Sequence, residues 1–346
     1  MNPAKIVVQN LYKVFGDQPQ DAMRLLRLGE SKESVFHNTG QVVGVNDVSF
    51  SVREGEIFVL MGLSGSGKST LIRLINRLID PSAGDILLDG QSITRLSAAE
   101  LVALRRRDMS MVFQSFALMP HRTVLENAAF GLEIAGVERR AREAAAMKVL
   151  EQVGLAPFAR KHPYQLSGGM QQRVGLARAL AVNPSLILMD EAFSALDPLK
   201  RAEMQDILLD LQREQRRTIF FVSHDLEEAL RIGTRIAIME GGRLVQVGTP
   251  QEIIESPADD YVRRFFRSVD TSRYLLARDL IEPGLAPTAD ATRCVPPSAS
   301  LNDVLHSLLG QPDPLTVAEQ GGSSLGVITS SSALRKLAEH RLRDTV

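Results

Sequence analysis

Short runs of apolar residues recur along the first 250 residues and are separated by longer stretches with helical periodicity. The apolar runs are rich in Val, Ile, Phe and Leu, and they cover residues 56–61, 109–113, 185–189, 218–222 and 235–239. Continuous apolar runs of this length are typical of strands covered on both faces. The stretches between them include predicted helices at Ser69–Leu78, Ala141–Gln152, Met170–Ala181 and Pro198–Gln215. Strands that alternate with helices predict an α/β core built on a parallel sheet.

Residues 17–43 interrupt this pattern near the start of the chain. An amphipathic stretch runs from Asp21 to Leu28, and Ser31 is a candidate cap for a second short helix. Gly40 is placed where such a helix would end. We therefore predict an inserted helical decoration in this part of the chain.

The composition changes again towards the end of the chain. Residues 281–300 are dense in Pro, Ala, Ser and Thr, which is typical of a linker or an irregular edge. A small α/β unit is predicted after it, with helices at Leu301–Leu309 and Ser332–Arg343 and strands at Leu315–Ala318 and Ser324–Thr329.

Composition and charge narrow the classes of protein. A chain of 346 residues with 44% hydrophobic and 23% charged residues is typical of a soluble globular protein of roughly two domains. The 40 Lys and Arg balance 41 Asp and Glu, so no bulk positive charge favours a nucleic-acid partner. The single cysteine, Cys294, allows no internal disulfide and no cysteine-based metal site. The chain contains no apolar run of 18 residues, so we expect any membrane role to be peripheral.

The segment Gly62–Thr70 fits the phosphate-binding pattern G-x-x-x-x-G-K-[ST] and lies between a predicted strand and a predicted helix. Its glycines let successive backbone N–H groups face the phosphates, and the helix N-terminus adds a favourable dipole. Lys68 would place a cation on the β and γ phosphates, and Ser69 is the expected Mg²⁺ ligand. The other candidate ATP-binding residues of this loop are Gly62, Ser64, Gly65, Ser66, Gly67 and Thr70.

Polar residues also follow three other predicted strands. Asp190 would hold Mg²⁺, commonly through water, and Glu191 would polarise the attacking water, although paired acids can instead cap a following helix. Gln114 and His224 follow two further apolar runs. Open parallel sheets bind ligands beyond the carboxyl ends of their strands. We therefore expect all four residues to converge on one site, with Gln114 near the nucleotide and Mg²⁺ and His224 near the γ-phosphate.

The segment Leu166–Met170 reads Leu-Ser-Gly-Gly-Met and opens a predicted helix. Here the sequence resembles the ABC ATPases, whose fingerprint is L-S-G-G-Q at the start of a helix. The resemblance implies a homodimer in which each ATP lies between the P-loop of one subunit and Ser167, Gly168 and Gly169 of the other. The Ser-Ala-Leu-Asp sequence that ends at Asp197 resembles the family's D-loop, which crosses the same interface.

The segment around Phe15 resembles the one that supplies an aromatic ring to stack on adenine. The alternative is that Phe15 is only a core residue, because the insertion that follows disturbs the usual spacing. The resemblance implies a P-loop ABC ATPase core in which a parallel sheet is joined by an antiparallel β subdomain and a helical subdomain. The domains that it implies are an ATPase domain at 4–268 with its helical subdomain at about 115–182, a linker at 269–292, and one small C-terminal α/β unit similar to a CBS repeat at 293–340.

Three departures from the family pattern narrow the resemblance. Met170 replaces the fingerprint glutamine, Ala192 replaces a proline after Asp-Glu, and residues 17–43 are inserted. Together with Gln114–His121 and Glu191–Pro198, they look like the ATPase of glycine betaine/proline betaine importers, which serve osmoprotection in bacteria. A choline or carnitine importer stays open, because the ATPase does not contact the solute.

This resemblance implies a set of partners. They are an integral membrane permease and a periplasmic or lipid-anchored substrate-binding protein, with the ATPase peripheral on the cytoplasmic face of the inner membrane and Mg-ATP as its ligand. That branch usually carries two C-terminal CBS repeats, and this chain has room for about one, which we expect to be regulatory. A DNA-repair ABC ATPase would carry a coiled coil or zinc-binding cysteines between Gln114 and Ser167, and neither occurs.

Overall fold

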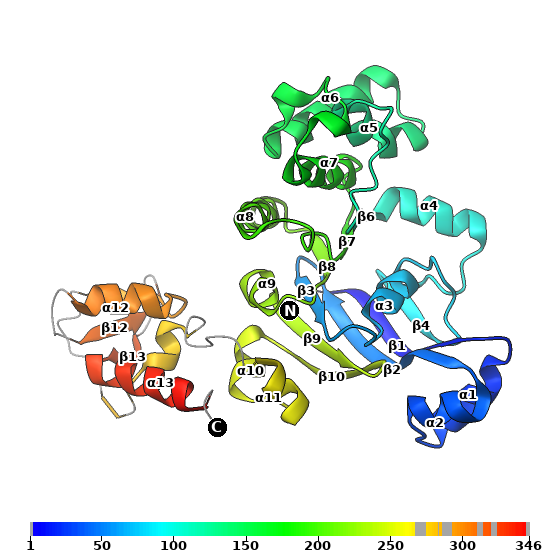
Figure 1. The fold of residues 1–346 in the computed structure, drawn as a ribbon. Coiled ribbons are helices and arrows are strands. Elements are labelled where there is room, and N and C mark those ends of the chain that lie inside the picture. The colour runs from blue at the N-terminus through cyan, green and yellow to red at the C-terminus, as the bar shows by residue number, and fades with distance from the viewer. Residues whose placement is uncertain are drawn as a thin grey trace. The chain divides into compact units, whose positions relative to one another are not determined.

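The computed structural model describes residues 3–266, 275–282, 284–285, 293–309, 314–319 and 324–343. The chain divides into two compact units, residues 1–250 and residues 251–346 (Figure 1). In the described ranges, no helix combines the length and the apolar character needed to cross a membrane.

A six-stranded sheet with the order β10-β9-β3-β8-β7-β6 forms the centre of the first unit. Its strands are β3 (Ile57–Met61), β6 (Met109–Phe113), β7 (Leu186–Asp190), β8 (Thr218–Val222), β9 (Arg235–Glu240) and β10 (Arg243–Gly248). Five strands are parallel, and only β10 pairs antiparallel with its neighbour. Every residue of β3 and β8 is buried, as their continuous apolar runs predict. The predicted parallel α/β core is confirmed.

An antiparallel sheet with the order β2-β1-β4-β5 packs against this core. Its strands are β1 (Ala4–Phe15), β2 (Val42–Arg53), β4 (Ala83–Leu88) and β5 (Gln91–Ser92). The rings of Phe50, Phe58 and Phe220 stack with centroids 5.1 to 5.9 Å apart and join the two sheets. One hydrophobic core therefore supports both sheets and α3 (Lys68–Ile75), the helix that follows the P-loop.

The insertion consists of α1 (Pro19–Arg27) and α2 (Lys32–Thr39). Ser31 caps α2, since its Oγ accepts a hydrogen bond from the Ser34 N–H at 3.2 Å. Gly40 ends the helix with a left-handed φ of 68°. Met23, Leu26 and Val35 from the two helices form a small buried cluster with Val14 and Val43 of β1 and β2.

The remaining helices of the first unit are α4 (Ala98–Asp108), α5 (Val124–Ile134), α6 (Arg139–Gln152), α7 (Gly168–Ala181), α8 (Pro198–Gln215) and α9 (Leu226–Ile232). Between α6 and α7 the chain forms the 3₁₀ turns Ala156–Phe158 and Pro163–Gln165. Of the helices, α5, α6 and α7 form a separate group within the predicted helical subdomain (Figure 1).

The second unit has its own three-stranded sheet, with the order β11-β12-β13. Its elements are α10 (Pro250–Glu255), which begins at the boundary, α11 (Asp260–Phe266), the 3₁₀ turn Ala277–Leu280, β11 (Cys294–Val295), α12 (Leu301–Leu309), β12 (Leu315–Ala318), β13 (Ser324–Ile328) and α13 (Ser330–Arg343). The helices and strands expected after residue 300 are all present. Much of the predicted linker 269–292 lies outside the described residues, and the CBS-like assignment stays a prediction.

Candidate active site

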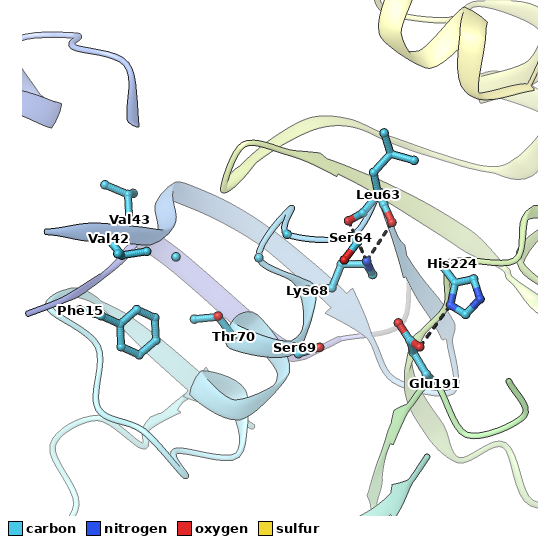
Figure 2. A pocket seen from close by; sticks show the side chains of 14 residues that line it. Phe15, Val42, Val43, Leu63, Ser64, Lys68, Ser69, Thr70, Glu191 and His224 are labelled. Atoms are coloured by element: carbon cyan, nitrogen blue, oxygen red, sulfur yellow. Dashed lines mark hydrogen bonds and ion pairs between the residues drawn. The ribbon is translucent and has the colours of Figure 1, made fainter. Parts of the chain in front are cut away.

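A pocket of about 690 Å³ lies beyond the carboxyl ends of β3, β7 and β8. Three parts of the first unit line it: the P-loop with the start of α3, the ends of β1 and β2, and the loops after β7 and β8 (Figure 2). The lining residues are Phe15, Val42, Val43, Gly44, Gly62, Leu63, Ser64, Gly65, Gly67, Lys68, Ser69, Thr70, Glu191 and His224.

Two glycines of the P-loop, Gly62 and Gly67, occupy positions at which a side chain does not fit. Gly62 has a φ of 150°, and a Cβ there would overlap the carbonyl oxygen of Met239. Gly67 has a φ of 104°, and its Cβ would overlap the carbonyl oxygen of Gly44. The P-loop therefore lies in direct contact with β9 and β2. This close approach places the N-terminus of α3, with its free N–H groups, at the pocket, which is a favourable position for an anion.

Lys68 is only 5% exposed, although its side chain ends in an amino group that is ordinarily charged. Its Nζ donates hydrogen bonds to the carbonyl oxygens of Gly62 at 2.8 Å and Leu63 at 3.0 Å. Burial lowers the pKa of Lys68, and the charges of Glu191 and Asp190 oppose that shift. The side chain thus supplies a cation at the floor of the pocket, and its bonds to the described residues leave a third N–H for an anionic ligand.

Asp190 ends β7 beside this cation. Its Oδ1 is buried and has no hydrogen-bond partner among the described residues. Burial raises the pKa of Asp190, the charge of Glu191 adds to the shift, and Arg73 and Lys68 oppose it. A buried carboxylate oxygen without a partner is costly unless a cation compensates it, and carboxylate oxygens are preferred ligands of Mg²⁺. The site therefore fits a magnesium ion next to bound phosphates.

Glu191 adopts a left-handed backbone with a φ of 46°, a conformation that costs about 1–3 kcal/mol for a non-glycine residue. Its N–H donates to the carbonyl of Val222 at 3.0 Å, and the Ser194 hydroxyl donates to its carbonyl at 2.9 Å. The turn directs the carboxylate into the pocket, where Oε2 lies 3.2 Å from Nδ1 of His224 (Figure 2). A carboxylate and an imidazole thus face the end of the pocket nearest Lys68.

The other end of the pocket is apolar. Phe15 is 40% exposed, and Figure 2 shows it beside Val42, away from Glu191 and His224. The ammonium group of Lys13 lies 5.1 Å from the centroid of its ring. A Cβ at Gly44 would approach the ring within 2.8 Å, so a glycine is needed beside it. A partly exposed ring between small residues suits a planar base.

Several predicted site residues do not line the pocket. Gln114 follows β6 and is exposed, so the pocket contains two of the four polar side chains expected to converge, with Asp190 adjoining it. Ser66 belongs to the P-loop, but its side chain is buried. Ser167 caps α7 by accepting a hydrogen bond from the Met170 N–H at 3.4 Å, with Gly168 and Gly169 opening the same helix. Asp197 caps α8.

Part of the pocket wall differs from the prediction. The insertion predicted at 17–43 includes Val42 and Val43, and the structure places both against the pocket. Val42 is the strand partner of Phe15 across β1 and β2. The signal was present in the sequence, since an apolar pair directly before Gly44 is typical of a strand that resumes after an insertion. No sequence pattern indicates that Arg73 lies close enough to Asp190 to lower the pKa of that carboxyl.

A phosphate-binding loop, a buried lysine and a carboxylate oxygen with no hydrogen-bond partner in the described part of the chain, all beyond a parallel sheet, define a P-loop ATPase. The sequence pattern of the family described as ABC transporter matches residues 45–194. The glycine betaine/proline betaine transport system ATP-binding protein ProV of Escherichia coli (strain K12) is 59% identical over 276 residues, which are 80% of this chain and 69% of that protein.

Other relatives agree with this assignment. The trimethylamine N-oxide transport system ATP-binding protein TmoW of Pelagibacter ubique is 43% identical over 335 residues, 96% of this chain and 97% of that one. A solved dimeric ATP-binding cassette, in a post-hydrolysis state with ADP and Pi, is 31% identical with a TM-score of 0.60 and covers 71% of this chain and 98% of its own. The chain belongs to the ABC transporter family as an ATP-binding subunit, and it hydrolyses ATP with Mg²⁺.

Proposed function

We propose that the chain powers the import of glycine betaine, proline betaine or a related quaternary amine by hydrolysing ATP for a separate integral membrane permease. The 59% identity to a betaine transport ATP-binding protein is the observation that carries this proposal. A second relative, named for glycine betaine and carnitine transport in Listeria monocytogenes, is 55% identical over 281 residues. Trimethylamine N-oxide is the second candidate solute, because the relative named for it matches almost the whole chain.

The phosphate end of the pocket supports specific roles. Lys68 and the N–H groups of the P-loop bind the β and γ phosphates, assisted by Ser64, Gly65 and Thr70. Ser69 and Asp190 hold Mg²⁺, and we assign Gln114, which follows β6 outside the pocket lining, to the same ion. The ion, when bound, neutralises charge on the phosphate oxygens. The Oδ1 of Asp190, which has no hydrogen-bond partner within the described ranges, supports its place in this set.

Glu191 and His224 act on hydrolysis itself. The carboxylate of Glu191 accepts a hydrogen bond from the attacking water and orients it towards the γ-phosphate. His224 donates to a γ-phosphate oxygen, and its contact with Glu191 sets the distance between the two groups. Phe15 stacks on the adenine at the other end of the pocket.

The second half of each ATP site comes from a partner copy. We assign Ser167, Gly168 and Gly169 to the γ-phosphate of the ATP held by the other subunit, and Asp197 to the same interface. The exposed start of α7 and the likeness to a dimeric cassette support this assignment. The subunit works as a homodimer, peripheral on the cytoplasmic face of the inner membrane, with a permease and a periplasmic or lipid-anchored substrate-binding protein.

Uptake measurements test the proposed solute. The ATPase, its cognate permease and their binding protein are expressed in a bacterial strain without betaine uptake, and radiolabelled solutes are supplied. We expect glycine betaine or proline betaine to enter and Lys68→Ala to abolish entry. Uptake of trimethylamine N-oxide alone would favour the second candidate, and uptake of none of these amines, including choline and carnitine, would contradict the proposal.

A further inference from the structure

The loops that carry Glu191 and His224 are tied together behind the pocket by one guanidinium group. Arg201, in the first turn of α8, forms an ion pair between its Nη1 and Oδ2 of Asp225, the residue after His224. Its Nη2 donates to the carbonyl oxygen of Leu196 at 3.3 Å. A single side chain thus contacts both the segment after β7 and the loop after β8.

These contacts complete a closed ring of interactions. Ser194 donates to the carbonyl of Glu191 at 2.9 Å, and two residues further on the carbonyl of Leu196 accepts from Arg201. Arg201 binds Asp225, whose neighbour His224 lies 3.2 Å from Glu191. The ring starts and ends at Glu191. Arg201 is therefore one of the links that join the two proposed hydrolytic groups.

A second, buried connection runs from the same loop to the same helix. The hydroxyl of Ser223 donates to Oε2 of Glu228 at 2.5 Å, and Gln205 of α8 donates to Oε1 at 3.2 Å. Ser223, Glu228 and Gln205 are at most 5% exposed. Gln205 follows Arg201 by four residues and so lies on the same face of α8. The residues on either side of His224 are thus both anchored to α8.

We propose that Arg201 is a positioning residue for ATP hydrolysis, which holds His224 against Glu191 by joining the loop after β8 to the segment after β7. This inference rests on the proposed roles of Glu191 and His224. Arg201 does not line the pocket, so its effect is on turnover and not on nucleotide binding. Its guanidinium reaches two acceptors at once, which a lysine ammonium on a single flexible stem does with less geometric control.

Arg201→Met tests the proposal, because methionine keeps a long side chain in a helix but removes both contacts. Arg217→Met is the matched control. Arg217 also joins the β7 and β8 segments, at their opposite ends, by donating to the carbonyl of Pro184 at 2.8 Å and to the Asn183 side chain at 2.6 Å. Thermal unfolding of both variants measures any general loss of stability.

We expect Arg201→Met to lower kcat for ATP about 10- to 100-fold, with KM and the affinity for a fluorescent ATP analogue within about twofold of wild type. Arg217→Met should keep the wild-type kcat, and Arg201→Lys should recover part of the loss. An equal fall in kcat for Arg201→Met and Arg217→Met, or a wild-type kcat for Arg201→Met, would overturn the proposal.

A double-mutant cycle identifies the residue through which Arg201 acts. In single-turnover measurements with radiolabelled ATP, Arg201→Met should add nothing to the loss caused by His224→Ala, because the positioned group is already absent. Additive losses would place the effect of Arg201 elsewhere and contradict the inference. These assays use hydrolysis alone, so a failure of betaine uptake would count against the proposed solute and leave this comparison intact.

Discussion

Glu191 has a strained backbone and a carboxylate that faces His224. A substitution that keeps the side-chain shape therefore tests the role of the carboxylate charge alone. Glu191→Gln keeps the side-chain length and the backbone contacts but loses the carboxylate that we propose as the base. We expect ATP binding to persist and turnover to fall about 10²- to 10⁴-fold. Equilibrium binding, phosphate release and gel filtration with ATP check this. The gel filtration should show an ATP-bound dimer, and a monomeric variant with normal hydrolysis would refute the assignment.

Glu228 predicts a pH dependence of stability. Burial raises its pKa, the charge of Asp225 adds to the shift, and Ser223, Gln205 and Arg201 oppose it. Because the folded pKa lies above the unfolded value of about 4.3, the stability that Glu228 contributes is present at low pH and lost as the pH rises through the folded pKa. Urea unfolding at pH 4.5 and pH 8 should show Glu228→Gln gaining stability relative to wild type at the higher pH. A constant difference between the two proteins would contradict this.

Among single residues, the sequence predicts the positions of those that belong to a motif of fixed spacing. Lys68, Asp190 and Glu191 lie where the motif and the strand ends place them, because backbone geometry fixes them locally. Arg201 could not be predicted. Its partners Leu196 and Asp225 are brought to it by the pairing of β7 with β8, and such tertiary contacts have no signature in local sequence.

The inserted helices pack in a small cluster with Val14 and Val43, apart from the main core, which predicts that they open independently of the central sheet. Leu26 is 4% exposed in a small cluster, and Leu→Ala at a buried site costs about 2–5 kcal/mol. We expect Leu26→Ala to speed amide hydrogen exchange in α1 and α2 while β3 and β8 stay protected. Leu28→Ala is the control, because Leu28 directly follows α1 and is 75% exposed. It should change hydrogen exchange neither in the inserted helices nor in the sheet. Faster exchange throughout the sheet would instead show a single cooperative unit.

Element prediction succeeded where periodicity was strong. The buried strands match their apolar runs to within a residue, and Ser31 and Gly40 bound α2 as their cap chemistry predicts. The antiparallel sheet has weaker signals. β1 contains register shifts around Val8–Val14, and its faces are buried unevenly, so no clean alternation marks it. Only the family resemblance indicated that sheet.

The proposed composite ATP site makes a prediction about pairs of subunits. Lys68→Ala removes one half-site and Ser167→Arg the other, so each variant alone should be inactive. Random pairing in an equal mixture makes about half of the dimers mixed, each with one intact site, so activity should recover to about a quarter of wild type if the sites are independent. Hydrolysis by Ser167→Arg protein alone would show that one chain suffices.

The C-terminal unit is proposed to regulate, since the residues of the pocket all precede it. A chain shortened to residues 1–270, reconstituted with its permease, should still hydrolyse ATP. Salt shortens the Debye length from about 10 Å at 0.1 M and weakens contacts between charged segments. We therefore expect the truncated complex to be active already at low KCl. Superimposable curves of transport-coupled ATPase activity against KCl would contradict a regulatory role.

The two ends of the insertion meet at one point, with consequences for how such a cassette could have evolved. Phe15 and Val42 are directly paired strand residues, and the backbone of Gly16 lies against the side chain of Gln41. Topologically, α1 and α2 are an enlarged hairpin loop. Lengthening a loop is inexpensive, about 0.6 kcal/mol for each doubling. An ancestral hairpin could therefore acquire or discard this helical pair without shifting the strand register that places Phe15, and the same junction is a natural point for grafting a reporter domain.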